Sequence, residues 1–324
     1  MRALLAIGAA GVAALLAIGG VAAAKAPPPP PRAVGGRTVT LVARGVRSPT
    51  AFAAVGGRLF VAAYGANRNS TTTGGVYLLG GGKAIRVPGS PAHVYGLAAV
   101  KGTLYVSAGK TILAWSNWNG KRFEKARIIA TAPVDFGTFN GVAVGPDGLI
   151  YVGANPDGSN PDYANTFLSV DPETGTITIV AKGIRQPWQP LFLPGWQLPL
   201  VSDLNQDDLG PTRPPDYLLA IRRGADYGYP ACPADAASCV NYSKPFFQFP
   251  AHASPMGLAF LRGRLYVALY VGLGTGPEVV SMPLRGGKAT PFLTRYRSPV
   301  IALGMVGGKL YSGVQAGDIY RVTP

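Results

Sequence analysis

The chain has 324 residues, of which 48% are hydrophobic and only 14% charged. This composition is that of a folded protein and not of a disordered one, and the length allows a large buried core. Its 44 glycines and 30 prolines disfavour long helices and favour short strands joined by tight turns, which predicts an all-β protein. The net charge of +15 comes from Lys and Arg that stand singly beside turns. We therefore expect no specific nucleic-acid binding, and at most weak association with an anionic cell envelope.

Residues 1–24 have the layout of a secretory signal, with one positive charge at Arg2, an apolar run and then small residues. An uncleaved N-terminal membrane anchor is the alternative, because the run approaches the roughly 20 residues that span a bilayer. Its many alanines and glycines insert weakly, which favours the signal. Residues 25–37, which include "PPPPPR", are expected to form a stiff extended spacer. We therefore expect export to the periplasm, the cell envelope or the exterior.

One phrase recurs along the rest of the chain. "SPTAFAAVGGRLFVAAY" at 48–64 returns as "SPMGLAFLRGRLYVALY" at 254–270, and four further copies are present. Their spacing is about 45 residues, except for an insertion of about 20 residues in the fourth unit. The residue at the Tyr of "LYV" marks the six copies: Phe60, Tyr105, Tyr151, Pro199, Tyr266 and Tyr311.

Each unit reads as an apolar run, a short turn with glycine and an alternating "L-Y-V-x-A" strand, followed in most units by two more strands. Four antiparallel strands per unit are typical of a β-propeller blade, so residues 38–324 are predicted to form one six-bladed β-propeller domain. The last unit stops after its third strand at 318–322, and the first begins with an unpartnered strand at 38–42. This N-terminal strand is predicted to complete the last blade and close the ring.

Functional residues are expected where the copies differ, because the repeated Leu, Tyr and Val residues are explained as core. Ligands of propellers usually bind at the mouth surrounded by the segments that lead into the innermost strands. These lead-in segments carry polar residues suited to a small-molecule site, although each could instead cap a carbonyl at a turn. They are His93, Thr138, Asn140, Arg185, Gln186, Gln189, His252 and Arg297. Both histidines of the chain occupy equivalent positions, in blades 2 and 5, which favours a functional role.

The fourth unit carries the inserted residues and an unusual concentration of oxygen ligands around Asn205 and Asp216. Asp203, Asp207 and Asp208 are the candidate ligands for Ca²⁺, with solvated turn carboxylates as the alternative, since the spacing is not that of an EF-hand. The two cysteines of the chain, Cys232 and Cys239, stand close together in the same unit. In an exported chain they are expected to form a disulfide.

Four phrases resemble one known family. "GPDGLIYVGA" is shared by several propeller families, whereas "GIRQPWQ", "HASPMGLAF" and above all "SDLNQDDLGPTRPPDYLLAIRRGADYGYPAC" are similar to the soluble pyrroloquinoline-quinone (PQQ) dehydrogenases of the glucose/sorbosone dehydrogenase family. The resemblance covers residues 40–324 and implies a six-bladed propeller in which calcium polarises the quinone. It further implies that a histidine before the third blade takes the hydroxyl proton while a hydride passes from the sugar to PQQ.

The resemblance places Arg185 and Gln186 near the quinone and the loop from Asp203 to Asp208 beside the metal and the cofactor. Asn140 and Arg297 are further cofactor-binding candidates from the lead-in segments.

Two departures from the family pattern affect the expected mechanism. The segment "GTFNGVAV" places Phe139 or a neighbour at the position of the proton-accepting histidine, and Tyr217 replaces a family carboxylate in "PDYLL". One hypothesis is an exported PQQ-dependent sugar or aldose dehydrogenase in which His252 or His93 accepts the proton. The alternative is a non-catalytic propeller that binds carbohydrate or another envelope ligand at the same mouth. A calcium-dependent lactonase is disfavoured, because no Glu stands in the lead-in segments.

Overall fold

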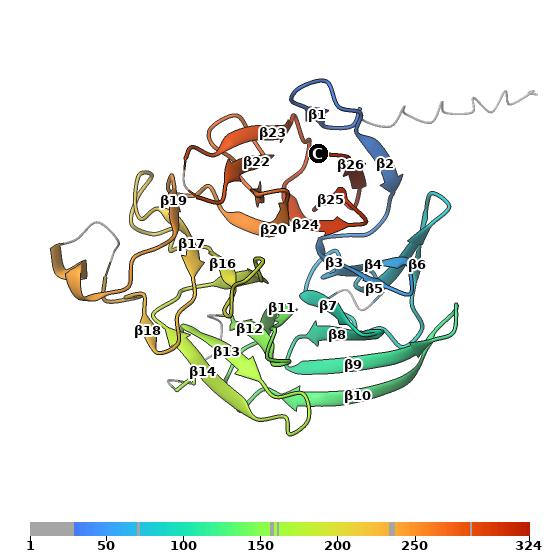
Figure 1. The fold of residues 1–324 in the computed structure, drawn as a ribbon, viewed down its shortest axis with the longest axis horizontal. Coiled ribbons are helices and arrows are strands. Elements are labelled where there is room, and N and C mark those ends of the chain that lie inside the picture. The colour runs from blue at the N-terminus through green and yellow to red at the C-terminus, as the bar shows by residue number, and fades with distance from the viewer. Residues whose placement is uncertain (1–28, 70–71, 156–158, 161, 233–236, 286) are drawn as a thin grey trace, which may run out of the picture.

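Six small antiparallel sheets surround a central axis as the blades of a propeller (Figure 1). The computed structural model describes residues 29–69, 72–155, 159–160, 162–232, 237–285 and 287–324, so the predicted signal segment 1–24 lies outside the described residues. Within these ranges no helix is long and apolar enough to cross a membrane. The all-β, six-bladed architecture predicted from the repeats is confirmed.

The first three blades follow each other along the chain, each running from its innermost to its outermost strand. Blade 1 contains β3 (Pro49–Val55), β4 (Arg58–Ala63), β5 (Gly75–Gly80) and β6 (Lys83–Arg86). Blade 2 contains β7 (Gly96–Val100), β8 (Thr103–Ala108), β9 (Thr111–Trp118) and β10 (Phe123–Thr131). Blade 3 contains β11 (Phe139–Val144), β12 (Ile150–Ala154), β13 (Thr166–Val170) and β14 (Ile177–Lys182).

Blades 4 to 6 carry the irregularities of the fold. Blade 4 contains β15 (Pro187–Leu191), β16 (Leu200–Asp203), β17 (Asp216–Ala220) and β19 (Phe247–Phe249). Between its last two strands lie β18 (Ala225–Asp226), which pairs with β14 of blade 3, and the short 3-10 helix η1 (Ala237–Asn241). Blade 5 contains β20 (Pro255–Leu261), β21 (Arg264–Leu269), β22 (Glu278–Pro283) and β23 (Thr290–Thr294). Blade 6 contains β24 (Val300–Val306), β25 (Lys309–Val314) and β26 (Ile319–Val322).

The N-terminal strand closes the ring, as predicted. Strand β2 (Thr40–Ala43) pairs antiparallel with β26, with Thr40 opposite Arg321, and so supplies the outermost strand of blade 6. The part of the predicted spacer just before it is not wholly outside the fold. Strand β1 (Arg32–Ala33) pairs with β23 and adds a fifth strand to the edge of blade 5. Both pairings satisfy backbone groups that an open sheet edge would expose.

The innermost strands contact one another in sequence around the axis, from β3 through β7, β11, β15 and β20 to β24 and back to β3. Glycines make this close approach feasible where blades 2, 3 and 4 meet. A Cβ atom on Gly96 would lie 2.6 Å from the backbone nitrogen of Val142, and one on Gly141 would lie 2.6 Å from the carbonyl oxygen of Trp188. The need for small residues at the channel neck therefore explains Gly96 and Gly141.

The hydrophobic core lies between adjacent blades in six separate clusters. The aromatic residue that marks the repeat belongs to this core in most units. Phe60 and Tyr151 are fully buried, and Tyr266 and Tyr311 are nearly so. The prediction that the repeated residues are core, and not site, is thus confirmed for these positions.

The two faces of the disc differ in charge. Because strands alternate in direction within a blade, the lead-in segments and the loops between second and third strands share one face, here called the upper face. The turns between first and second strands and between third and fourth strands lie on the opposite, lower face. Exposed cations occupy these lower turns: Arg58, Lys83, Lys101, Lys121, Arg122, Arg222, Arg223, Arg262, Arg264, Arg285, Lys288 and Lys309.

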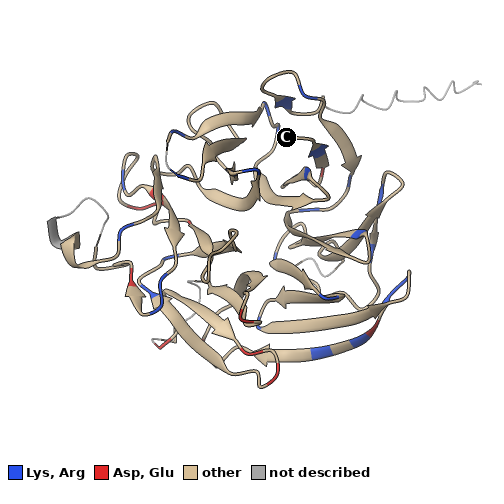
Figure 2. Cartoon of the chain, in the orientation of Figure 1, with Lys and Arg blue, Asp and Glu red and all other residues tan. Residues whose placement is uncertain are grey.

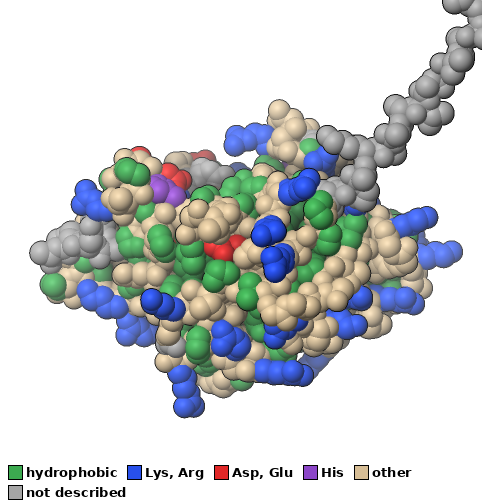
Figure 3. Space-filling view, turned by 90° about the horizontal axis from the view of Figure 1, so that it is seen from above, with side chains coloured by type: hydrophobic (Ala, Val, Ile, Leu, Met, Phe, Trp, Pro, Cys, Tyr) green, Lys and Arg blue, Asp and Glu red, His purple; other side chains and the backbone are tan. Residues whose placement is uncertain are grey.

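The exposed cations are spread over both faces, since Arg47, Lys110, Arg213, Arg295 and Arg297 lie on the upper face, but more of them lie in the lower turns. Lys and Arg are spread over all the blades when the disc is viewed along its axis (Figure 2). Viewed edge-on, many of them lie on the side away from the visible histidine and others lie on its own side, where acidic side chains accompany it (Figure 3). Residues far apart in sequence collect on one face because their turns are equivalent in successive blades.

Candidate functional site

The lead-in segment of blade 4 is held to the loop that follows β16, at the upper mouth of the channel. Arg185 donates through Nη1 to the carbonyl oxygens of Asn205 at 2.6 Å and Leu204 at 3.3 Å. The backbone N–H of Gln186 donates to Asp203 Oδ1 at 2.8 Å. Arg185 and Gln186, predicted from the "GIRQPWQ" phrase, therefore lie directly against the acidic loop.

Asp203 ends β16 and is only 4% exposed. Burial raises the pKa of its carboxyl to about 7, and the nearby carboxyl of Asp216 acts in the same direction. The N–H of Gln186 and the guanidinium of Arg185 oppose this rise in the pKa, because both favour the charged form. The carboxyl therefore changes charge near neutral pH inside the protein.

Asp216 joins blade 4 to blade 5. Its Oδ1 accepts the backbone N–H of Asn205 at 2.7 Å, and its Oδ2 accepts the backbone N–H of Ser254, which leads into blade 5, at 2.7 Å. Burial raises the pKa of Asp216 above the ordinary value, while these two N–H groups oppose the rise. Sequence reasoning counted Asp216 among the acidic residues but did not foresee this connecting role.

His252 lies on the same loop system. Its Nδ1 is 3.1 Å from Asp207 Oδ1, its Nε2 is 2.9 Å from the carbonyl oxygen of Gly210, and the side chain is 30% exposed. The carbonyl of Gly210 and then the carboxylate of Asp207 raise the pKa of His252 above the ordinary value. The imidazole is therefore held by two acceptors that favour its protonated form.

His93 makes the equivalent contacts in blade 2. Its Nδ1 is 2.7 Å from the carbonyl oxygen of Tyr64, its Nε2 is 3.0 Å from that of Arg68, and its ring lies 4.8 Å from the ring of Tyr64. Each histidine thus bridges a lead-in segment to the loop between second and third strands of the preceding blade. This shared arrangement explains why both histidines occupy the same place in their units.

The three carboxylates predicted to bind Ca²⁺ do not converge. Asp203 is buried against Gln186, Asp207 faces His252, and the exposed Asp208 accepts a hydrogen bond from Gln206 Nε2 at 3.3 Å. Across the described ranges, no group of three or more His, Cys, Asp or Glu side chains is placed to hold a metal ion. The residues in this arrangement do not fit a calcium site.

Among the described residues, no hydrogen bond joins the side chains of Asn140 and Arg297 to Arg185, Gln186 or the acidic loop. Asn140 is fully buried and donates through Nδ2 to the carbonyl oxygen of Pro187 at 2.8 Å, so it ties blade 3 to blade 4. Arg297 is exposed in blade 6, beside a depression of about 70 Å³ that Asp318 and Tyr320 also line. The sequence pattern gave no reason to distinguish these two residues from the other candidate site residues.

Three buried oxygens in the lead-in segments of blades 3 and 4 have no hydrogen-bond partner among the described residues. They are Thr138 Oγ1, Asn140 Oδ1 and Gln189 Oε1. Buried acceptors of this kind normally meet a donor, either from water or from a ligand. All three belong to residues that the sequence pattern singled out.

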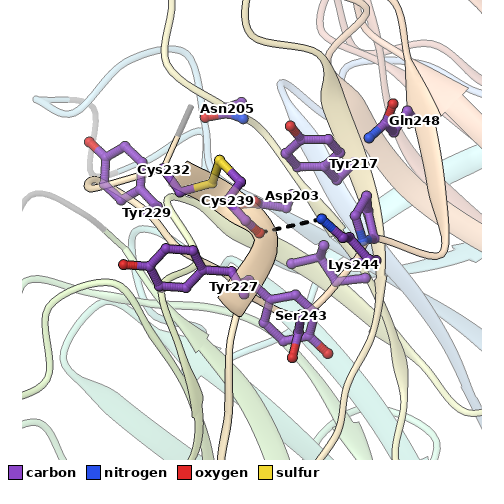
Figure 4. A pocket seen from close by; sticks show the side chains of 14 residues that line it. Asp203, Asn205, Tyr217, Tyr227, Tyr229, Cys232, Cys239, Ser243, Lys244 and Gln248 are labelled. Carbon is purple, nitrogen blue, oxygen red and sulfur yellow. Dashed lines mark hydrogen bonds between the residues drawn. A yellow bond between two sulfur atoms is a disulfide. The ribbon is translucent and has the colours of Figure 1, made fainter. Parts of the chain in front are cut away.

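A pocket of about 140 Å³ lies beside Asp203 and Asn205, between blade 4 and the segment that carries η1 (Figure 4). Asp203, Asn205, Tyr217, Tyr227 and Lys244 are among the residues that line it. The predicted Cys232–Cys239 disulfide is present, with its Cα atoms 5.4 Å apart, and also lines the pocket. The pocket was not predicted, although the tyrosines of "DYGYPAC" were a signal for it.

Comparison with known proteins supports the fold. No family model and no curated protein sequence matches the chain. Among solved structures, the Trichoderma reesei carbohydrate-active enzyme of family AA12 in an iodide structure has a TM-score of 0.76 and 18% identity, covering 91% of this chain and 97% of its own. A calcium structure of the same family has a TM-score of 0.72.

Two dehydrogenases are similar over nearly their whole length. A glucose dehydrogenase has a TM-score of 0.70 and 13% identity, with 89% of this chain and 99% of its own covered. The PQQ-bound aldose sugar dehydrogenase from Streptomyces coelicolor has a TM-score of 0.64 and 20% identity, with 90% and 99% covered. At these identities the likeness shows a shared fold, which is the fold that the sequence resemblance implied.

Proposed function

We propose that the protein is an exported oxidoreductase of the PQQ-linked sugar dehydrogenase type, with its site at the upper mouth beside blades 4 and 5. The observation that carries the proposal is the hydrogen-bonded connection from Arg185 through Asn205 and Asp216 to Ser254, two residues after His252. It fixes a guanidinium and an imidazole on one loop system. The similar fold of two sugar dehydrogenases supports the same reaction class.

The guanidinium of Arg185 fits PQQ, which carries three carboxylates. Within the described chain, Arg185 uses only Nη1 for hydrogen bonds to protein acceptors, so its other nitrogens remain for an anion. When bound, PQQ supplies the two-electron acceptor for oxidation of a sugar hydroxyl or aldehyde. No role is assigned to calcium, because the carboxylates do not form a site for it.

Buried oxygens of blades 3 and 4 suit a polyhydroxylated substrate. Thr138 Oγ1, Asn140 Oδ1 and Gln189 Oε1 are buried oxygens that require donors, and sugar hydroxyls are donors. His252 is the proposed proton acceptor, because it is partly exposed and Asp207 orients its ring. The ring must lose its contact with Gly210 to accept a proton at Nε2.

Binding of carbohydrate without turnover is the second candidate. Phe139, at the position where the family resemblance implies the proton acceptor, is fully buried in the core between blades 2 and 3. Both nitrogens of each histidine also face acceptors of the protein. A protein with these contacts retained would bind a sugar without oxidising it.

The deciding experiment is a titration of the purified protein with PQQ, followed by absorbance, with and without added Ca²⁺. Dye reduction is then measured with a panel of aldoses and an artificial electron acceptor. We expect saturable PQQ binding that does not require Ca²⁺, and its loss in Arg185→Ala. The matched control is Arg297→Ala, which removes an exposed arginine from a different blade. Absence of PQQ binding would refute the dehydrogenase, and sugar binding by calorimetry without dye reduction would select the second candidate.

A further inference from the structure

At the lower mouth of the channel, four of the six blades present cations that have no acidic partner among the described residues. The turns between first and second strands carry Arg58 in blade 1, Lys101 in blade 2, Arg262 and Arg264 in blade 5 and Lys309 in blade 6. All five are exposed, and none of them forms an ion pair within the described part of the chain. These five residues are here called the basic ring.

Acidic residues do little to neutralise this face. In blade 3 the lower turns carry Asp147, Asp171 and Glu173. Asp147 accepts a hydrogen bond from the hydroxyl of Tyr151 at 2.8 Å, and Glu173 lies 3.9 Å from Arg127 Nη2. The carboxylate in blade 2 nearest to a lower turn, Glu124, accepts from Asn119 at 3.0 Å. The excess of positive charge therefore extends over the lower turns of the other blades.

An apolar hollow occupies the centre of the basic ring. It measures about 630 Å³, and its lining includes Phe52, Leu97, Leu191, Phe260 and Met305. Val100, which stands next to Lys101 in the turn of blade 2, is 37% exposed. The lower face thus offers aliphatic and aromatic carbon at its centre and cations around it.

We propose that the lower face docks on a bilayer that contains anionic phospholipid. Lipid headgroups are complementary to the basic ring, and the interfacial region accepts apolar side chains beside the cations. A polyanion such as nucleic acid would contact the cations but gain nothing from the apolar centre. The charged groups also lie around a disc and not along a groove that follows a strand. Docking in this orientation turns the upper mouth away from the lipid. The inference does not depend on the function proposed for that mouth.

Co-sedimentation with vesicles tests the docking. The full chain is mixed with vesicles of phosphatidylcholine alone or with about one third phosphatidylglycerol, at low and at high salt. The test variant is Arg58→Glu/Lys101→Glu/Lys309→Glu. The control is Arg47→Glu/Lys110→Glu/Arg295→Glu, which makes the same charge change at exposed positions of the upper face. Because every protein carries the same N-terminal segment, the differences between them report on the faces.

We expect binding to the anionic vesicles to fall by more than about tenfold in the lower-face variant and by about twofold in the control. Binding of the original chain should weaken at high salt. Equal binding to neutral and anionic vesicles, or an equal loss in both variants, would overturn the proposal. Circular dichroism and urea denaturation show whether the variants remain folded.

A second measurement reports contact with the lipid interior. Val100→Trp places an indole on the lower face, and Val271→Trp places one in the loop after β21 on the upper face. The chain already contains four tryptophans, so the quenching is compared with that of the original protein. Vesicles with brominated acyl chains should increase the quenching only in Val100→Trp. Equal quenching in both variants, or tighter binding to duplex DNA or dextran sulfate than to anionic vesicles, would refute a membrane surface as the partner.

Discussion

Asp216 Oδ2 accepts the backbone N–H of Ser254 at 2.7 Å, so a carboxyl at the start of a third strand fixes the segment that leads into the next blade. The other oxygen of the same carboxyl fixes the loop that binds Arg185. A single buried group therefore sets the relative position of the two lead-in segments that the proposed site requires.

Replacing Asp216 by Asn should disturb both contacts at little change in volume. An amide has one oxygen, so the N–H of either Asn205 or Ser254 loses its acceptor, and we expect a loss of about 1–3 kcal/mol in the free energy of unfolding. Urea denaturation measures this loss. The control Asp208→Asn, at an exposed position, should change the value by less than about 0.5 kcal/mol. Equal effects of the two substitutions would contradict the connecting role.

The buried Asp203 should make the stability depend on pH. Its pKa is about 7 in the folded protein, above the value of an unfolded aspartate, so the folded state holds the proton more tightly. Its contribution to stability is therefore full below the unfolded pKa and falls as the pH rises from about 4 to about 7. Urea denaturation at several pH values should show a flatter dependence in Asp203→Asn. An unchanged slope would show that this carboxyl is ionised throughout.

The two histidines allow a direct titration by NMR. The raised pKa of His252 predicts a midpoint above the ordinary value of about 6.5, and Asp207→Asn should lower it. In the variant His93→Gln only one histidine is left, so its NMR resonance is that of His252. If His252 accepts the substrate proton, dye reduction should rise with pH through the same midpoint, because only the neutral ring accepts a proton. A midpoint unaffected by Asp207→Asn would remove the carboxylate as the orienting group.

Gly141, in the innermost strand of blade 3, should not tolerate a side chain. In Gly141→Ala the new Cβ would lie 2.6 Å from the carbonyl oxygen of Trp188, so the first strands of blades 3 and 4 must separate. We expect a loss of about 1–3 kcal/mol in unfolding free energy by urea denaturation. Gly80→Ala is the matched control, because its Cβ meets no atom within 4 Å and its backbone φ is not positive. Comparable losses would show that strand entropy, and not the close approach, decides the cost.

The repeated phrase was sufficient to predict the architecture because each copy encodes one local hairpin, and local hairpins determine a blade. The unpartnered strand at the start and the missing strand at the end then predicted closure by β2. The short β1 could not be predicted, since a two-residue strand in a proline-rich segment has no periodicity. Its pairing with β23 depends on the position of blade 5 in three dimensions.

The site was predictable in position more than in detail. The lead-in segments contained Arg185, Gln186 and His252, which the structure places on one connected loop system. The sequence could not show that Asp203 and Asp207 point to different partners, because neighbouring carboxylates in a loop appear alike whether they converge or diverge. The excess of cations on the lower face escaped prediction for a related reason, as sequence spacing does not reveal which turns share a side of the disc.

Pairing between β2 and β26 joins the two ends of the described fold across almost the whole length of the chain. Such a contact has an entropic cost of loop closure and forms only after β26 has been synthesised. Blades 1 to 5 are formed mainly by strands that are consecutive in the sequence, so each can pair as soon as its own segment has been synthesised. The sixth blade closes the ring, so a nascent chain that lacks β26 remains an open arc with exposed strand edges.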